Sequence, residues 1–250
     1  MKRFMKAMAA IMLSLTVICV ACTKDPGNGG NNNGGNGNGG SGGGDDHDYV
    51  DLGLPSGLLW ATCNVGANAP EEYGDYFAWG ETQPKDTYDW STYQYCTGGN
   101  YEYPYYNMLT KYCTDSSYGY NGFTDDLTTL LPEDDAATAN WGSGWRLPSQ
   151  EEWQELYNNT AHLWTTQNGV NGKLFTATNG NSLFLPAAGY CRFDGRINAM
   201  VCGDYWSSSI YTDGPLSARN LHFDMFGCFM DGLPRRSGLS VRAVLPASKN

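Results

Sequence analysis

The sequence predicts an α+β domain with two helices, short antiparallel strands and long ordered loops. Residues 149–152, Ser-Gln-Glu-Glu, form a capping box, in which the first serine and the last glutamate each accept a backbone N–H of the other. Asn179-Gly180 separates two apolar segments and predicts a hairpin, because both residues tolerate positive φ. Residues 220–223, Asn-Leu-His-Phe, alternate polar and apolar side chains, as in a strand with one buried face.

The N-terminal residues have the pattern of a secretion signal that ends in a lipidation site. Three basic residues lie within the first six, and an apolar run follows over 7–21. A run of this length suits the core of a signal peptide and is too short to span a bilayer. Val20-Ala21-Cys22 resembles a lipobox, so we expect cleavage before Cys22 and acylation of that cysteine, which would anchor the chain in the outer membrane. An ordinary cleaved signal is the alternative.

A flexible tether is expected after the signal peptide. Residues 27–44 are eleven Gly, six Asn and one Ser, so no apolar burial offsets the entropy of ordering them. The sequence therefore predicts a signal peptide over 1–21, a lipidated tether over 22–47 and one folded domain over 48–250. Lys24-Asp25 partly matches a signal that resembles surface export in Bacteroidetes lipoproteins, which favours display at the cell surface.

The acidic charge of the chain argues against nucleic acid as a partner. The formal net charge is −11, and it becomes −14 once three basic residues leave with the signal peptide. Binding a phosphate backbone requires a basic face. Electrostatic docking on anionic lipid requires one too.

The first half of the domain is expected to contain few strands and both helices. Residues 49–61 predict an opening hairpin that is interrupted by glycine and proline. The stretch over 67–128 is rich in Tyr, Gly and Asp with weak periodicity, so it predicts long, ordered loops pinned by aromatic packing. Asp134-Asp135 suits the first turn of one helix. The capping box starts the other helix, whose buried stripe is Trp153, Leu156 and Tyr157.

The second half is expected to consist of strands. Residues 174–178 and 182–185 form the predicted hairpin around Asn179-Gly180. Residues 184–244 predict four strands, with a central Tyr-Trp-Ser-Ser-Ser segment at 205–209 and a closing strand that ends at Val244.

The domain carries an even number of cysteines, which suggests disulfides in an exported chain. We expect a Cys96–Cys113 bridge, which would staple the tyrosine-rich loops, and a Cys191–Cys202 bridge, which would close a loop of ten intervening residues. A Cys63–Cys228 bridge then follows by elimination. Six cysteines allow fifteen pairings, and the alternative is that several stay reduced as small buried hydrophobes. The cysteine and histidine spacings do not suggest zinc.

Several short sequence segments of the domain resemble the motifs of one protein family in their order and spacing. They are GLLWATCNVGA at 57–67, GDYFAWGET at 74–82, WGSGWRLP at 141–148, YWSSS at 205–209 and GLSVRAV at 238–244. This set resembles the Fibrobacter-type major paralogous domain, a lipoprotein-borne branch of the C-type-lectin-like fold related to formylglycine-generating enzymes. The resemblance spans about 49–246 and implies that fold, but folds of this kind carry many unrelated functions.

Catalysis is not expected from this sequence, and no cofactor or metal is predicted. The histidines, His47, His162 and His222, lie outside motifs that present a nucleophile. Two of Glu81, Asp204 and Asp213 could form the carboxylate pair that glycoside hydrolysis requires. The sequence does not give the distance between the two carboxyl groups, on which that mechanism depends. The cysteine-based copper site of formylglycine-generating enzymes does not map onto Cys191, Cys202 or Cys228, so that enzyme is the weakest alternative. The calcium-sugar motifs of true C-type lectins are absent from the sequence.

The sequence thus predicts a surface-displayed binding module for an extracellular protein or glycan. A structural subunit or tip component of an envelope or fimbrial assembly is the alternative. The resemblance places an exposed surface before the closing strand, where large apolar groups at a turn are costly to leave in water. Tyr, Phe, Met and Arg are also enriched at interfaces. The candidate ligand-binding residues are Tyr211, Asp213, Arg219, Met225, Phe226, Phe229, Met230, Arg235 and Arg236. For Phe226, Phe229 and Met230, an inward-pointing core position is the alternative.

Overall fold

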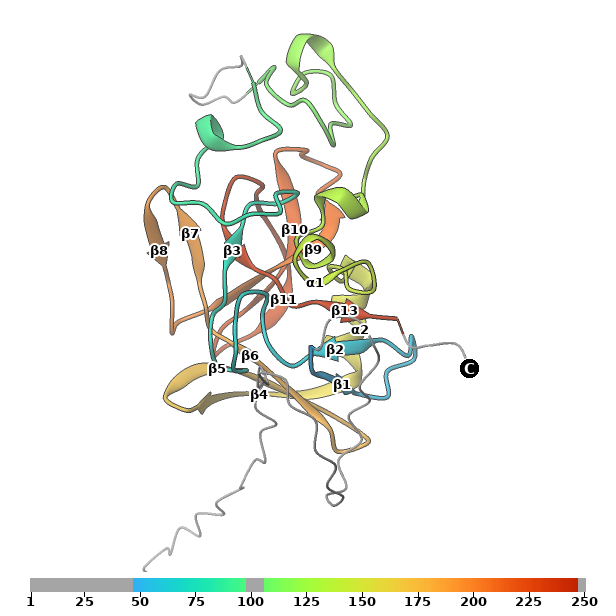
Figure 1. Cartoon of the computed structure of the whole chain (residues 1–250), viewed down its shortest axis with the longest axis vertical. Helices are drawn as coiled ribbons and strands as arrows, with labels where there is room; N and C mark the ends of the chain where they lie inside the picture. Colours follow the sequence, from blue (N-terminus) through green and yellow to red (C-terminus); the bar gives the residue numbers. More distant parts are fainter. Residues whose placement is uncertain (1–46, 98–105, 247–250) are drawn as a thin grey trace, which may run out of the picture.

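The computed structural model describes residues 47–97 and 106–246, and it has a mixed α+β architecture of several small sheets with two α-helices (Figure 1). The predicted signal peptide, the lipidation site Cys22 and the tether up to residue 46 lie outside the described residues. Among the described residues, no helix is both long and apolar enough to cross a membrane.

The largest sheet has five strands in the order β11-β10-β9-β12-β3. Its members are β3 (Tyr76–Phe77), β9 (Gly203–Ile210), β10 (Ser217–Phe223), β11 (Cys228–Pro234) and β12 (Leu239–Ser240). Strands β9, β10 and β11 are antiparallel neighbours, whereas β12 runs parallel to β9. Strand β11 therefore forms one edge of this sheet.

Two three-stranded sheets confirm both predicted hairpins. The first joins the ends of the domain and contains β1 (Tyr49–Asp51), β2 (Leu59–Ala61) and β13 (Val244–Leu245). The second is a meander of β4 (Thr160–Gln167), β5 (Val170–Ala177) and β6 (Ser182–Pro186). In the β5–β6 turn Gly180 adopts a positive φ of 88°, whereas Asn179 keeps a negative φ, so only one of the two residues uses the conformation on which the hairpin prediction rested.

The region over 184–244 is divided more finely than the four predicted strands. It begins in β6 and also contains the two-stranded ribbon of β7 (Tyr190–Arg192) and β8 (Gly195–Ile197). The closing segment is not one continuous strand, because β12 and β13 are separated by residues 241–243. In that gap Arg242 is fully buried and donates to the backbone carbonyls of Ala61 and Thr62.

Both predicted α-helices form, and their caps explain where they begin. Helix α1 (Ala136–Trp141) starts after Asp135, whose carboxylate accepts the backbone N–H groups of Ala137 and Thr138. Helix α2 (Gln150–Asn159) starts after Ser149 with the complete capping box. Its Trp153 and Leu156 are buried, whereas Tyr157 is only partly buried. The remaining helical turns are of the 3-10 type, namely Trp90–Thr92, Tyr120–Gly122 and Pro132–Asp134.

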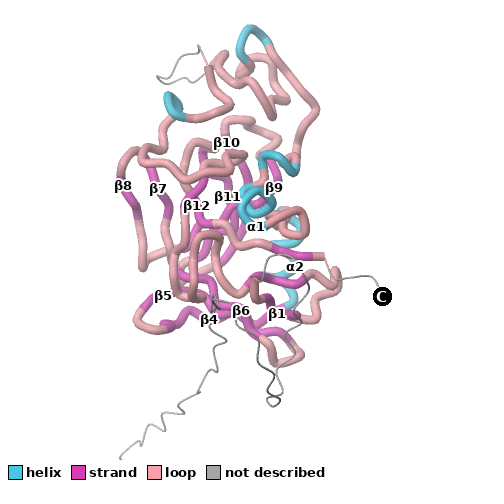
Figure 2. The backbone as a smooth tube through the Cα atoms, in the orientation of Figure 1, coloured by secondary structure: helices cyan, strands magenta, loops and turns pink. Residues whose placement is uncertain are grey.

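Strand β9 separates two apolar clusters because its alternate side chains point to opposite faces of the sheet. Tyr205 packs with Trp60, Trp153 and Phe223 in one cluster. Trp206 belongs to the other, which is formed largely by the loops between β3 and α1. Figure 2 shows these loops gathered at the end of the molecule opposite the β4–β5–β6 sheet. The prediction of long, ordered loops over 67–128 is confirmed for the described part of that range.

Candidate functional site

The turn between β10 and β11 is held in place by polar contacts from two sides. Asp224 Oδ1 accepts the backbone N–H groups of Phe226 at 2.7 Å and Gly227 at 2.8 Å. Burial opposes ionisation of Asp224, but these two hydrogen bonds, together with the nearby charges of His222 and Lys173, outweigh it and lower the pKa of the carboxyl group. From β5, Lys173 Nζ donates to the Gly227 carbonyl at 2.6 Å. The turn is therefore a defined structure that stays charged and hydrogen-bonded at neutral pH.

This turn presents large apolar side chains to solvent. The exposed fraction is 87% for Phe226, 62% for Met225 and 52% for Phe229. Phe226 and Phe229 therefore do not point into the core, whereas Met230 is partly buried. Full burial of such a side chain contributes about 1.5–3 kcal/mol. A partner that covered this turn would therefore gain free energy from burying these side chains.

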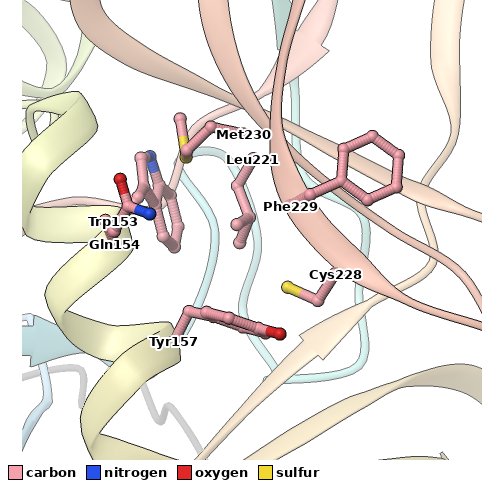
Figure 3. A pocket seen from close by; sticks show the side chains of 7 residues that line it. All are labelled: Trp153, Gln154, Tyr157, Leu221, Cys228, Phe229 and Met230. Atoms are coloured by element: carbon pink, nitrogen blue, oxygen red, sulfur yellow. The ribbon is translucent and has the colours of Figure 1, made fainter.

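A small cavity lies beside the turn, between α2 and the β10–β11 pair. Its volume is about 190 Å³. Figure 3 shows helix α2 on one side of it, facing strands β10 and β11, with the Phe229 ring turned away toward the other face of the sheet. Pockets for small-molecule ligands usually measure ~300–1,000 Å³, so this cavity suits a single side chain or a group of similar size. The lining residues are Trp153, Gln154, Tyr157, Leu221, Cys228, Phe229 and Met230.

Tyr211 and Arg219 form a separate contact toward the other end of the hairpin. The Arg219 guanidinium lies 3.9 Å from the centre of the Tyr211 ring. That ring packs over Gly232, where a Cβ atom would lie only 2.7 Å from it. Asp213 is exposed in the adjacent connection. Since strand residues advance about 3.3 Å each, Arg219 lies roughly 13 Å along β10 from the residue that begins the turn, Phe223. The structure therefore does not unite all nine predicted residues in one patch.

Arg235 and Arg236 are buried, so their assignment to an exposed ligand surface is wrong. Arg235 is 0% exposed and donates to the backbone carbonyls of Tyr112 at 2.8 Å and Lys111 at 3.2 Å. Arg236 is 5% exposed, with Asp89 at 3.9 Å and the Trp90 ring beneath it. Both guanidinium groups stabilise the loops, because Arg235 satisfies backbone carbonyls and Arg236 lies against the Asp89 carboxylate and the Trp90 ring.

The predicted disulfides are also wrong, because four of the cysteines involved have free thiols: Cys113, Cys191, Cys202 and Cys228. Each of the three proposed bridges needs at least one of these four. The Cys113 Sγ donates to the Asp115 carbonyl at 3.1 Å, and the backbone pairs Cys96 with Leu109 instead. Burial raises the pKa of both Cys202 and Cys228 to about 12, so these thiols are protonated at neutral pH. They fit the alternative of small buried hydrophobes.

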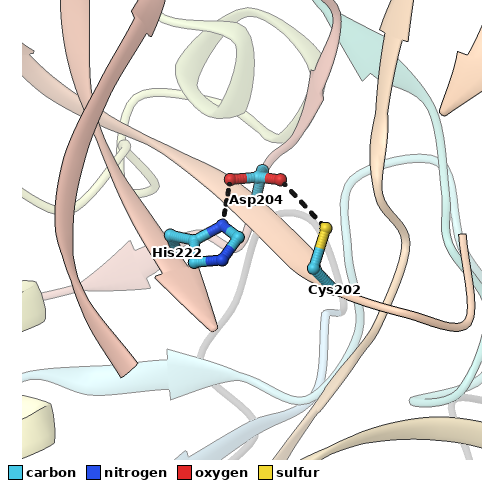
Figure 4. A group of neighbouring side chains, drawn as sticks. All are labelled: Cys202, Asp204 and His222. Carbon is cyan, nitrogen blue, oxygen red and sulfur yellow. Dashed lines mark hydrogen bonds and ion pairs between the residues drawn. The ribbon is translucent and has the colours of Figure 1, made fainter. Parts of the chain in front are cut away.

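The structure brings together one group of side chains that the sequence analysis did not connect. Cys202, Asp204 and His222 meet across β9 and β10, because the antiparallel register places His222 directly opposite Asp204 (Figure 4). The sequence did contain one indication of this group: Cys202 and Asp204 are two residues apart, and alternate residues of a strand share one face. The histidine could be added only once the register of the neighbouring strand was known. Of the other carboxylates considered for hydrolysis, Glu81 forms an ion pair with Lys85.

Comparison of the chain with family models, with curated proteins and with solved structures gave no match. The resemblance to the Fibrobacter-type major paralogous domain stays a prediction from the sequence.

Proposed function

We propose that this chain is a lipid-anchored, surface-displayed binding module of C-type-lectin-like fold, which recognises an extracellular protein or glycan through the turn between β10 and β11. The observation that carries this proposal is the 87% exposure of Phe226 on a turn fixed by hydrogen bonds. Met225 and Phe229 extend the apolar surface around it.

The fixed turn supports binding because little conformational entropy would be lost when a partner covers it. Rigid aromatic groups are typical anchors of interfaces, and ordering costs reduce affinity where the contact surface is mobile. The hydrogen bonds from Asp224 and Lys173 hold the backbone of the turn before any ligand arrives. The neighbouring cavity of about 190 Å³ would accept one apolar group of the same ligand.

The anchoring part of the proposal rests on the sequence. The apolar run over 7–21, Val20-Ala21-Cys22 and the Gly/Asn tether together favour a lipoprotein. Two helices ahead of most of the strands, with long loops between β3 and α1, agree with the resemblance to a C-type-lectin-like domain. The acidic net charge of −11 supports a partner other than nucleic acid.

Binding is tested with a protein and glycan array probed with the purified chain and with matched phenylalanine variants. Phe226→Ala should weaken binding of the captured ligand by at least about 2 kcal/mol, or roughly 30-fold in Kd. Phe193→Ala is the control, because Phe193 is also exposed (49%) but lies in the turn between β7 and β8. Equal loss in both variants, or normal binding by Phe226→Ala, would reject this turn as the site.

Anchoring is tested separately in cells. Cys22→Ala should move the protein from the membrane fraction to the soluble fraction, since the thiol that carries the lipid is lost. External protease should cut the tether of the parent chain on intact cells. If the variant still sediments with membranes after a high-salt wash, the anchor lies elsewhere.

A second candidate function, a structural subunit of an envelope assembly, is favoured by the position of β11. This strand is an edge of the five-stranded sheet, and an edge strand offers backbone groups that a strand of another chain can pair with. Light scattering of the purified chain distinguishes the two functions. Self-assembly that Phe229→Lys abolishes would favour the structural role, whereas a monomer that binds its ligand saturably would favour recognition.

A further inference from the structure

The face of the large sheet that points away from α2 carries three side chains of the kinds that bind transition metals. Asp204 on β9 lies between Cys202, just before that strand, and His222 on β10 (Figure 4). The His222 Nδ1 is 2.9 Å from Asp204 Oδ1, and the Cys202 Sγ is 3.5 Å from Asp204 Oδ2. The three ligand atoms all lie within 4.8 Å of one another.

The group is almost closed to water, and a neighbouring amide that contacts it has a buried acceptor without a partner. Cys202 is 4% exposed and Asp204 is 2% exposed, while the His222 side chain keeps 21% of its surface. Asn220 Nδ2 donates to Asp204 Oδ1 at 2.9 Å. The other end of that amide, Asn220 Oδ1, is buried and has no hydrogen-bond partner among the described residues. A buried acceptor without a partner costs free energy and needs an explanation, such as an ion or a water.

The contact between Cys202 and Asp204 also favours a cation. A thiol is a weak hydrogen-bond donor, so in this arrangement one oxygen of a buried carboxylate is satisfied poorly. The other oxygen, Oδ1, already has His222 and Asn220 as partners, whereas Oδ2 has the thiol. A positive ion among these three groups would interact with the carboxylate more strongly than the thiol does.

We propose that Cys202, Asp204 and His222 bind a zinc-class divalent ion, with a water as the fourth ligand and Asn220 as a supporting group that donates to Asp204. Thiolate, imidazole and carboxylate are the three ligand types of protein zinc sites, at about 2.3, 2.0–2.1 and 2.0–2.2 Å from the ion. The thiolate excludes calcium and magnesium, which prefer oxygen ligands. In a tetrahedral site with these bond lengths the ligand atoms are about 3.3–3.6 Å apart. The observed separations of 2.9 Å, 3.5 Å and at most 4.8 Å differ from these values by about 1 Å or less, so metal binding requires only a small shift of the side chains.

Such an ion would join β9 to β10 through side chains in addition to the backbone ladder. The thiol of Cys202 loses its proton to solvent when the metal binds. The Phe229 ring packs against His222 with ring centroids 5.1 Å apart, so the ion would also order the exposed aromatic surface on that side of the sheet.

The test is a metal titration of the full chain in mild detergent, with a phosphine reductant that keeps thiols reduced without binding the metal. Cobalt(II) should bind at one equivalent to this group and give a thiolate-to-cobalt charge-transfer absorption, which zinc then abolishes. Zinc should raise the Tm, since a ligand of the folded state stabilises it. Cys202→Ser and His222→Gln should each remove the charge-transfer band or the one-equivalent binding. Asn220→Ala should weaken zinc binding by roughly 10–100-fold, the usual effect of losing a supporting group.

Cys228→Ser is the matched control, because Cys228 is another buried thiol, in the same sheet but outside the group. It should keep the band and the zinc affinity. X-ray absorption of the zinc-loaded parent chain requires no substitution and should show one sulfur with nitrogen and oxygen neighbours. The proposal is overturned if the parent chain does not bind one equivalent of metal, if the charge-transfer band survives Cys202→Ser, if His222→Gln leaves both the band and the affinity unchanged, or if the zinc shell holds no sulfur or several.

Discussion

The loops between β3 and α1 and the hairpin of β10 and β11 differ in an instructive way. The loops contain few regular elements, yet Trp79 and Tyr112 are both 0% exposed there. The hairpin is regular, yet its turn leaves Phe226 87% exposed. Burial in this chain therefore does not follow regular backbone structure. It depends on whether polar side chains satisfy the irregular backbone, because buried backbone groups without partners are costly.

In the loops, buried polar side chains form the hydrogen bonds that hold the irregular backbone in place. The Asp134 carboxylate accepts hydrogen bonds from Tyr95, Tyr112 and Lys111. The Tyr112 hydroxyl oxygen also accepts the Leu131 N–H, and the Tyr112 backbone N–H donates to the Asp125 carboxylate. Aromatic residues with a polar atom suit this role, since they bury a large apolar surface and still make one directed hydrogen bond. The loops are thus a second core.

The largest predicted effect is the loss of Trp79 from that second core. Trp79→Ala should lower the free energy of unfolding by about 3–5 kcal/mol, because it removes a large buried ring and its hydrogen bond to the Ser207 carbonyl. Urea unfolding monitors the change in Cm. Phe123→Ala, at a loop residue that is 36% exposed, is the control and should shift stability far less. A small effect of Trp79→Ala would mean that the loops are not a core.

The second prediction concerns the buried carboxylate. Asp134→Asn should cost about 1.5–3 kcal/mol at pH 7, since hydrogen bonds to a charged group are lost and Lys111 keeps its charge without this partner. Burial raises the pKa of Asp134, but the hydrogen bonds from Lys111, Tyr112 and Tyr95 outweigh it and lower the pKa overall. A folded-state pKa below the unfolded value of about 4 contributes stability above that pH, which is lost as pH falls through the folded pKa.

The stability difference between the parent and Asp134→Asn should therefore narrow below about pH 4. Urea unfolding at several pH values measures it. Glu133→Gln, at an exposed neighbour, should leave the pH dependence nearly unchanged. A difference that stays constant from pH 7 to pH 3 would show that the charge of Asp134 does not contribute.

Local patterns could be predicted from the sequence because their causes are local. The capping box at Ser149 and the turn at Asn179-Gly180 each depend on residues within four positions of one another. The exposure of Phe226 could also be anticipated, since a short turn between two strands has no neighbour to cover its tip.

The failed predictions depend on contacts between distant residues. Arg235 was expected at the surface because arginine is usually exposed, but its partners are carbonyls 123 and 124 residues away. Disulfide pairing requires close Cβ atoms, which spacing along the chain does not determine. The meeting of Cys202 and His222 requires the strand register that sets Asp204 opposite His222.

The third prediction tests a regular element whose cause is local. Ser149→Ala should destabilise the chain by ~1 kcal/mol, because the Glu152 N–H at the start of α2 loses its side-chain acceptor. Thermal unfolding of the variant measures the loss as a lower Tm. Ser143→Ala, at an exposed serine outside any helix, is the control. If both variants unfold alike, the capping box contributes nothing to the free energy of unfolding.

The smallest predicted effect on stability is at the residue that carries the proposed function. Phe226→Ala should change the free energy of unfolding by no more than about 0.5 kcal/mol, as surface substitutions do, because its ring has no core contacts to lose. Phe223→Ala, three residues earlier and 0% exposed, should instead cost about 3–5 kcal/mol. Urea unfolding measures the free energy of unfolding of both variants, which remove the same type of side chain from the same hairpin. A large loss at Phe226 would mean that its ring stabilises the fold, and the ring would then not be available to a partner. A small loss together with lost ligand binding would separate recognition from folding at this turn.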